Sequence, residues 1–118
     1  MAKLTGTSGN DRLVGTAGRD TVDALGGNDS IFGGADNDLL YGRAGNDRIF
    51  GQGGTDLVSG GSGDDRIEGG AARDRLWGDP GNDTILGGTG NDELCGGSGN
   101  DLLRGEAGND RIFGDTGN

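Results

Sequence analysis

The sequence of 118 residues is poor in the residues that build most enzymes and most apolar cores. It has no histidine, one cysteine and one proline, and aromatic residues make up only 4% of it. The absence of histidine excludes a Ser-His-Asp catalytic triad, and a single cysteine excludes an internal disulfide. Hydrophobic residues make up 29%, which is too few for two layers packed around a large core. No run of 18 apolar residues predicts a membrane span, and the first residues lack the apolar run of a signal peptide.

The charged residues point to a cation as the partner. Asp and Glu number 20 against 10 Lys and Arg, which leaves a net charge of −10. Nucleic acid and anionic membranes are therefore not expected partners. Without histidine, the plentiful metal ligands are carboxylate and carbonyl oxygens, which favour calcium or magnesium over zinc, copper or iron.

The chain is a tandem array of nine-residue repeats. Twelve nonapeptides run from Gly6 to Phe113 without insertion, residues 1–5 fit the tail of a preceding repeat, and residues 114–118 are a truncated thirteenth. Position one is Gly in eleven repeats, with Ala24 as the exception, and position four is Gly in ten, with Asp36 and Ala72 as exceptions. Position eight is always Leu, Ile or Val. Position six is always Asp: Asp11, Asp20, Asp29, Asp38, Asp47, Asp56, Asp65, Asp74, Asp83, Asp92, Asp101 and Asp110.

Each column of the repeat predicts a local structure. Glycines at positions one and four reach positive φ cheaply, so the first six positions predict a tight turn. Positions seven to nine predict a short strand with position eight inward. One aliphatic side chain per repeat cannot close a core, so the repeats must stack. Two repeats per coil and about six coils give an all-β parallel β-roll.

This stacking predicts two ladders of six aspartates on opposite edges of the roll, about 4.8 Å apart. Like charges at that spacing repel each other, and a divalent ion between neighbouring coils reverses the sign of the interaction. Turn carbonyls complete the oxygen shell, for example those of Gly61, Gly63, Gly88, Gly90, Gly97 and Gly99. Five gaps in each ladder set a ceiling of about ten Ca²⁺ ions.

The repeats resemble the repeats-in-toxin (RTX) nonapeptide family, with consensus Gly-Gly-x-Gly-x-Asp-x-U-x, where U is a large aliphatic residue. Residues 87–95 and 96–104 follow it at every defined position. The resemblance implies a right-handed β-roll that is disordered without calcium and folds on binding it, in a secreted, extracellular bacterial protein exported by a type I system. The family's secretion signal lies beyond the repeats, and this sequence stops inside a turn. We therefore expect a segment of a larger protein with a flanking partner domain.

Several departures and alternatives remain open. Ala72 and Arg73 replace Gly and Asn beside Asp74, so the calcium contacts there are expected to be the weakest. Catalysis by this chain is not expected. A calcium-dependent adhesion or ice-binding solenoid segment is the alternative function. Outward aromatic residues such as Phe32 and Phe50 either mark a surface for self-association or only stiffen the sheet.

Overall fold

The computed structural model describes residues 1–117, and this part of the chain consists of strands and turns. It contains no helix with the length and hydropathy needed to cross a membrane. The strands are β1 (Ala2–Thr5), β2 (Arg12–Val14), β3 (Asp20–Asp23), β4 (Ser30–Gly34), β5 (Leu39–Ala44), β6 (Arg48–Gln52), β7 (Leu57–Ser62), β8 (Arg66–Gly70), β9 (Arg75–Trp77), β10 (Thr84–Thr89), β11 (Glu93–Cys95), β12 (Leu102–Ala107) and β13 (Arg111–Phe113). Asn118, the last residue of the truncated repeat, lies outside the described residues.

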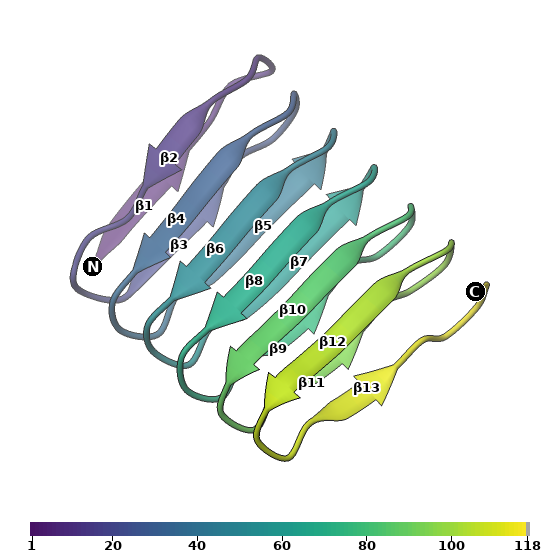
Figure 1. The fold of residues 1–118 in the computed structure, drawn as a ribbon. Coiled ribbons are helices and arrows are strands. Elements are labelled where there is room, and N and C mark those ends of the chain that lie inside the picture. The colour runs from purple at the N-terminus through teal and green to yellow at the C-terminus, as the bar shows by residue number, and fades with distance from the viewer. Residues whose placement is uncertain (118) are drawn as a thin grey trace.

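The strands form two parallel sheets that face each other (Figure 1). One sheet contains the odd-numbered strands in order from β1 to β13, and the other contains the even-numbered strands from β2 to β12. Each strand pairs with the strand two repeats away, so that Ile31 lies beside Ile49 and Ile49 beside Ile67. This register confirms an all-β solenoid with two nonapeptides in each coil and about six coils.

The core is the column of aliphatic residues at position eight. These side chains have no exposed surface from the second to the tenth repeat: Val22, Ile31, Leu40, Ile49, Val58, Ile67, Leu76, Ile85 and Leu94. Leu13 and Leu103 are partly buried near the two ends of the stack, and Ile112 in the last strand is 49% exposed. The molecule is accordingly thin, with extents of 32 × 27 × 13 Å.

The turns differ from the sequence prediction in the position that needs positive φ. Position four has positive φ as predicted from the third repeat onward, even at Asp36 (73°) and Ala72 (79°), whereas Gly9 and Gly18 in the first two repeats do not. Position one does not, and the prediction was wrong there. Position two, which varies freely in sequence, adopts positive φ instead, at Leu25 (75°) and Gln52 (76°) for example. The reason is that several strands continue through positions one and two, as Gly34 pairs with Gln52, and the chain bends only after them.

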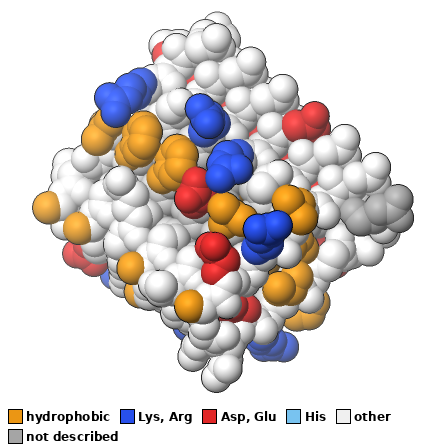
Figure 2. All heavy atoms as spheres, viewed as in Figure 1, with side chains coloured by type: hydrophobic (Ala, Val, Ile, Leu, Met, Phe, Trp, Pro, Cys, Tyr) orange, Lys and Arg blue, Asp and Glu red, His pale blue; other side chains and the backbone are white. Residues whose placement is uncertain are grey.

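The outward aromatic residues stack along the sheets as predicted. The rings of Phe32 and Phe50 are 5.2 Å apart and nearly parallel, and the guanidinium of Arg12 lies 4.9 Å from the centre of the Phe32 ring. Figure 2 shows hydrophobic and basic side chains side by side on the face formed by the even-numbered strands. Arginines also cover Tyr41, Trp77 and Phe113. These contacts favour the stiffening role.

Candidate metal centre

The position-six aspartates form the two ladders that the repeat predicts. One consists of Asp11, Asp29, Asp47, Asp65, Asp83 and Asp101, and the other of Asp20, Asp38, Asp56, Asp74, Asp92 and Asp110. The backbone N–H of each ladder aspartate from Asp11 to Asp92 donates to Oδ1 of the aspartate 18 residues later, at 2.7–2.9 Å. Sequence reasoning missed this bond, which holds one oxygen of every carboxylate from the second coil onward.

The second carboxylate oxygen is buried and has no hydrogen-bond partner in most of the repeats. This holds for Oδ2 of Asp29, Asp38, Asp47, Asp56, Asp65, Asp74, Asp83, Asp92 and Asp101. The first eight of these residues are at most 3% exposed. Burying an ionised oxygen without a partner is costly. The nine Oδ2 atoms are therefore the observation in this structure that calls for a cation.

The first two repeats satisfy the same oxygen without a cation. The backbone N–H of Thr7 donates to Asp11 Oδ2 at 2.6 Å, and the Thr16 N–H donates to Asp20 Oδ2. Both threonine hydroxyls also donate to these carboxylates. Thr7 and Thr16 occupy position two without positive φ, unlike the residues at this position from the third repeat onward. The N-terminal ends of the two ladders are thus closed by threonine.

Position-one glycines leave space for two oxygen atoms to come together. A Cβ built on Gly69 would lie 2.5 Å from Asp74 Oδ2 and 2.7 Å from the carbonyl oxygen of Gly87 in the next coil. A Cβ on Gly87 would lie 2.6 Å from Asp92 Oδ2 and 2.7 Å from the Gly105 carbonyl oxygen. The unpartnered carboxylate oxygen and a backbone carbonyl of the following coil therefore border the same space.

The turn carbonyls named from the sequence belong to two different positions of the repeat. Gly61, Gly88 and Gly97 occupy position two, Gly63, Gly90 and Gly99 occupy position four, and all six have positive φ. The carbonyls of Gly63, Gly90 and Gly99 lie against the α-carbons of Gly81, Gly108 and Gly117 in the next coil. Their role as metal ligands stays a prediction.

Burial raises the pKa of the central ladder carboxyls. The pKa is about 6 for Asp47, about 7 for Asp56, Asp74 and Asp83, and about 8 for Asp65, where the neighbouring carboxylates add to the effect of burial. Asp20 shows the opposite effect, because the hydrogen bond from the Thr16 backbone lowers its pKa. In the middle of the stack, burial therefore raises the pKa of carboxyls whose Oδ2 has no hydrogen-bond partner, whereas at Asp20 hydrogen bonds lower it.

The donor set fits a hard cation that is held mostly by backbone oxygens. Within residues 1–117, no three Asp, Glu, His or Cys side chains converge on one point. An ion beside a ladder aspartate would therefore take its free Oδ2 and complete its shell from carbonyls of the turns. Calcium accepts six to eight oxygens at about 2.3–2.6 Å in flexible geometry, whereas magnesium demands a strict octahedron.

The position-five side chains form a third ladder, which was not predicted from the sequence. The backbone N–H groups of Asn28 and Asn46 donate to Oδ1 of Asn10 and Asn28 in the preceding coil. The pattern continues through Asp64, Asn82 and Asn100. The frequent Asn at position five was the available signal for it. This ladder ties together the rims of the turns on one edge.

The fold and these edges define a class, a β-solenoid with calcium-binding repeats. The sequence model described as RTX calcium-binding nonapeptide repeat (4 copies) matches residues 5–40, 25–58, 32–67, 59–94 and 87–118. The chain belongs to this family, and the resemblance noted from its repeats is confirmed. No curated protein matches the chain.

Proposed function

We propose that this chain is a calcium-driven folding module, disordered without calcium and ordered on binding it, which supports the secretion and stability of a larger exported protein. The observation that carries the proposal is the set of nine buried Oδ2 atoms without a hydrogen-bond partner. The small apolar core supplies one side chain per repeat. The free energy gained by burying so small a core offsets only a small part of the cost of burying rows of charged carboxylates.

The ions would stabilise the roll by bridging successive coils. The ladder aspartates would supply carboxylate oxygens, above all the nine unpartnered Oδ2 atoms from Asp29 to Asp101, and the glycine-rich turns would supply carbonyls. With up to about ten sites, binding and folding become one equilibrium, because the sites exist only when neighbouring coils are stacked. An ordering step outside the cell, where calcium is abundant, would favour outward movement of a chain exported unfolded by a type I system. The flanking domain of the larger protein would then be the cargo.

Circular dichroism in the far ultraviolet tests the folding step directly. The chain is titrated with CaCl₂ after removal of metal, and MgCl₂ serves as the control. We expect a cooperative gain of β signal with calcium and little change with magnesium, because the turns favour a large, irregular oxygen shell. A chain that is equally ordered with and without calcium contradicts the proposal.

A further inference from the structure

We propose that the two edges of the roll bind calcium unequally and that one edge loads first. The asparagine edge consists of the turns at residues 6–11, 24–29, 42–47, 60–65, 78–83 and 96–101. The arginine edge consists of the turns at residues 15–20, 33–38, 51–56, 69–74, 87–92 and 105–110. The inference deepens the proposed function and rests on it.

The asparagine edge is regular at positions four and five of the repeat, and its one departure at position one is Ala24. Its position-five residues form the unbroken ladder from Asn10 to Asn100, with five backbone-to-side-chain hydrogen bonds of 2.8–2.9 Å. All its position-four residues from Gly9 to Gly99 are glycine. When the coils stack, these bonds hold the turn carbonyls of this edge in a uniform row, which lowers the ordering cost of binding there.

The arginine edge is irregular at positions four and five of the repeat. Arg19 and Arg73 occupy position five, directly before Asp20 and Asp74. The ladder bonds at position five on this edge are those from Thr55 to Asn37 and from Asn109 to Asn91. Asp36 and Ala72 replace glycine at position four and hold positive φ at a cost in backbone strain. The rims of these turns are less uniform and carry two exposed cations.

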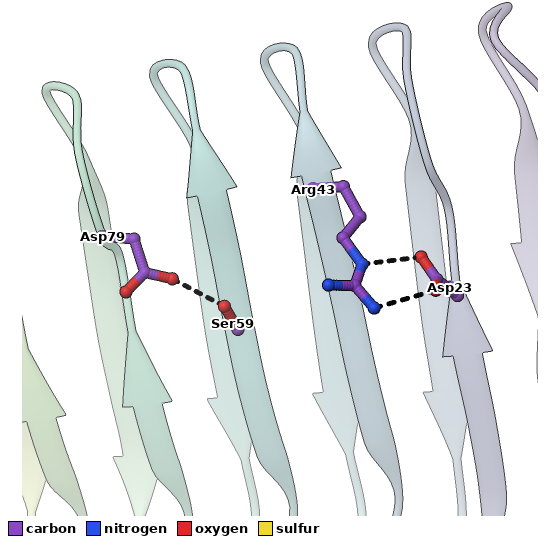
Figure 3. A network of polar contacts seen from close by, with 4 residues as sticks. All are labelled: Asp23, Arg43, Ser59 and Asp79. Carbon is purple, nitrogen blue, oxygen red and sulfur yellow. Dashed lines mark hydrogen bonds and ion pairs between the residues drawn. The ribbon is translucent and has the colours of Figure 1, made fainter.

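The charges in the turns also favour calcium binding at the asparagine edge. The cation in the turns of the asparagine edge, Arg43, is neutralised by Asp23, with its Nε 2.8 Å from Oδ1 and its Nη2 2.9 Å from Oδ2 (Figure 3). Asp79 is held at this edge by the Ser59 hydroxyl at 2.6 Å, and Asp64 lies in the position-five ladder.

The cations of the other edge stay uncompensated. Across residues 1–117, neither Arg19 nor Arg73 has a carboxylate within ion-pair distance. Both edges carry two carboxylates besides the ladder, Asp64 and Asp79 on the asparagine edge and Asp36 and Glu106 on the arginine edge. An incoming divalent cation therefore meets two unpaired guanidinium groups on the arginine edge that have no counterpart on the asparagine edge.

Both edges belong to the same coils, so loading one of them orders both sheets. We therefore expect calcium binding in two steps. The first fills the asparagine edge and produces the whole β signal, and the second fills the arginine edge of a roll that is already folded.

The test combines equilibrium dialysis with radioactive calcium and circular dichroism on the same samples. The key variant is Arg19→Asn with Arg73→Asn, which gives the arginine edge the usual position-five residue. Its second step should move about fivefold to lower calcium, the effect of removing a unit charge about 8 Å from a divalent ion in water. The control, Arg48→Asn with Arg104→Asn, makes the same change of net charge on the sheet face and should leave the separation of the two steps unchanged.

Two further variants assign the steps to the edges. Asp65→Asn, in the middle of the asparagine edge, should weaken the first step together with the β signal. Asp74→Asn, at the matching place on the arginine edge, should weaken the second step and leave the midpoint of the β signal in place.

The outcomes separate this inference from the function on which it rests. Binding in a single step, or equal shifts in the two arginine double variants, overturns the inequality of the edges and leaves calcium-driven folding intact. A first step that is lost in Asp74→Asn and kept in Asp65→Asn reverses the order and also overturns it. A chain that binds no calcium overturns the proposed function itself.

Discussion

Glycine has two different tasks in this repeat. At position four it supplies positive φ, as at Gly63 (114°) and Gly90 (112°). At position one its φ is ordinary, and the missing side chain leaves room for the ladder carboxylate and for a carbonyl of the next coil. The same residue type is therefore required once for backbone conformation and once for space.

Adding a methyl group at position one should disrupt the site. In Gly69→Ala the new Cβ would lie 2.5 Å from Asp74 Oδ2 and 2.7 Å from the Gly87 carbonyl oxygen. We expect a loss of about 1–3 kcal/mol in the free energy of unfolding measured by urea denaturation in saturating calcium, the usual cost of overpacking. Ala24 shows that one such methyl is accommodated near the first coil.

The matched control is Gly53→Ala, at position three. Its nearest neighbour would be the Gly34 carbonyl oxygen at 3.8 Å, and its φ is not positive. This variant should keep or slightly raise the stability. Equal losses in Gly69→Ala and Gly53→Ala would show that the space at position one is not needed.

At position two, a substitution to glycine is expected to raise the stability. Leu25 is 41% exposed and holds φ at 75°, a conformation that costs a side-chain-bearing residue about 1–2 kcal/mol. Leu25→Gly removes that strain at an entropic cost of about 0.5–1 kcal/mol. We therefore expect a net gain of about 0.5 kcal/mol in calcium-bound stability by urea denaturation.

Leu102→Gly is the comparison, because Leu102 is 50% exposed and lies within β12 without positive φ. Its replacement should lower the stability by about 0.5–1 kcal/mol, the cost of glycine within a strand. If both glycine variants lose stability to the same extent, strain at position two is not a significant term.

At the scale of the strand and turn, each ladder aspartate serves two neighbours. Oδ1 accepts the N–H of the aspartate in the preceding coil, and Oδ2 lies beside the position-one glycine. The first contact orders the backbone, and the second leaves a charge without a partner. In the middle of the stack, burial raises the pKa of these carboxyls to between about 6 and about 8.

Protons should therefore substitute in part for calcium. The folded-state pKa values of Asp56 (about 7) and Asp65 (about 8) lie above the ordinary value of 3.8, so the folded chain binds more protons than the unfolded chain. Stability from this source is complete below pH 3.8 and is lost as the pH rises through the folded pKa values. In the presence of a chelator, circular dichroism should show more β signal at pH 5 than at pH 8.

Saturating calcium should remove this advantage of acid, because protons and calcium compete for the same oxygens. The β signal at pH 8 should then equal or exceed the signal at pH 5. A calcium-free chain whose β signal is the same at both pH values would argue against the raised pKa values of the ladders.

At the scale of the whole molecule, the net charge of −10 comes from the ladders. Without the twelve ladder aspartates, 8 acids remain against 10 bases, a net charge of +2. Since each calcium adds two charges, five ions bring the total from −10 to zero. Under the proposed function, the ions that bridge the coils would also remove the repulsion among the ladder carboxylates.

Small-angle X-ray scattering should register this collapse. The folded chain has a Cα radius of gyration of 12.7 Å. An unfolded chain of this length has a radius of about 35 Å. We expect calcium to reduce the measured value from near the second figure to near the first, and equimolar magnesium to leave it large. A compact calcium-free chain at pH 8 would contradict the repulsion argument.

The repeat by itself determined the strands, the inward aliphatic column and the two aspartate ladders. These features follow from the fixed nine-residue spacing, because any stacking of two repeats per coil superimposes equal positions. The sequence also showed the resemblance to the RTX family through residues such as Gly96, Gly99 and Asp101.

Only the tertiary structure decided which glycines need positive φ, where each carboxylate oxygen points and which edge carries uncompensated charge. Asp23 meets Arg43, and Ser59 meets Asp79, across 20 residues of sequence. The Thr16 backbone N–H turns toward Asp20, whereas Leu25 at the same position of the next repeat takes positive φ. The contacts of Asp23 with Arg43 and of Ser59 with Asp79 join neighbouring coils, and a pattern within one repeat cannot specify them, because the partners lie about one full turn of the solenoid away.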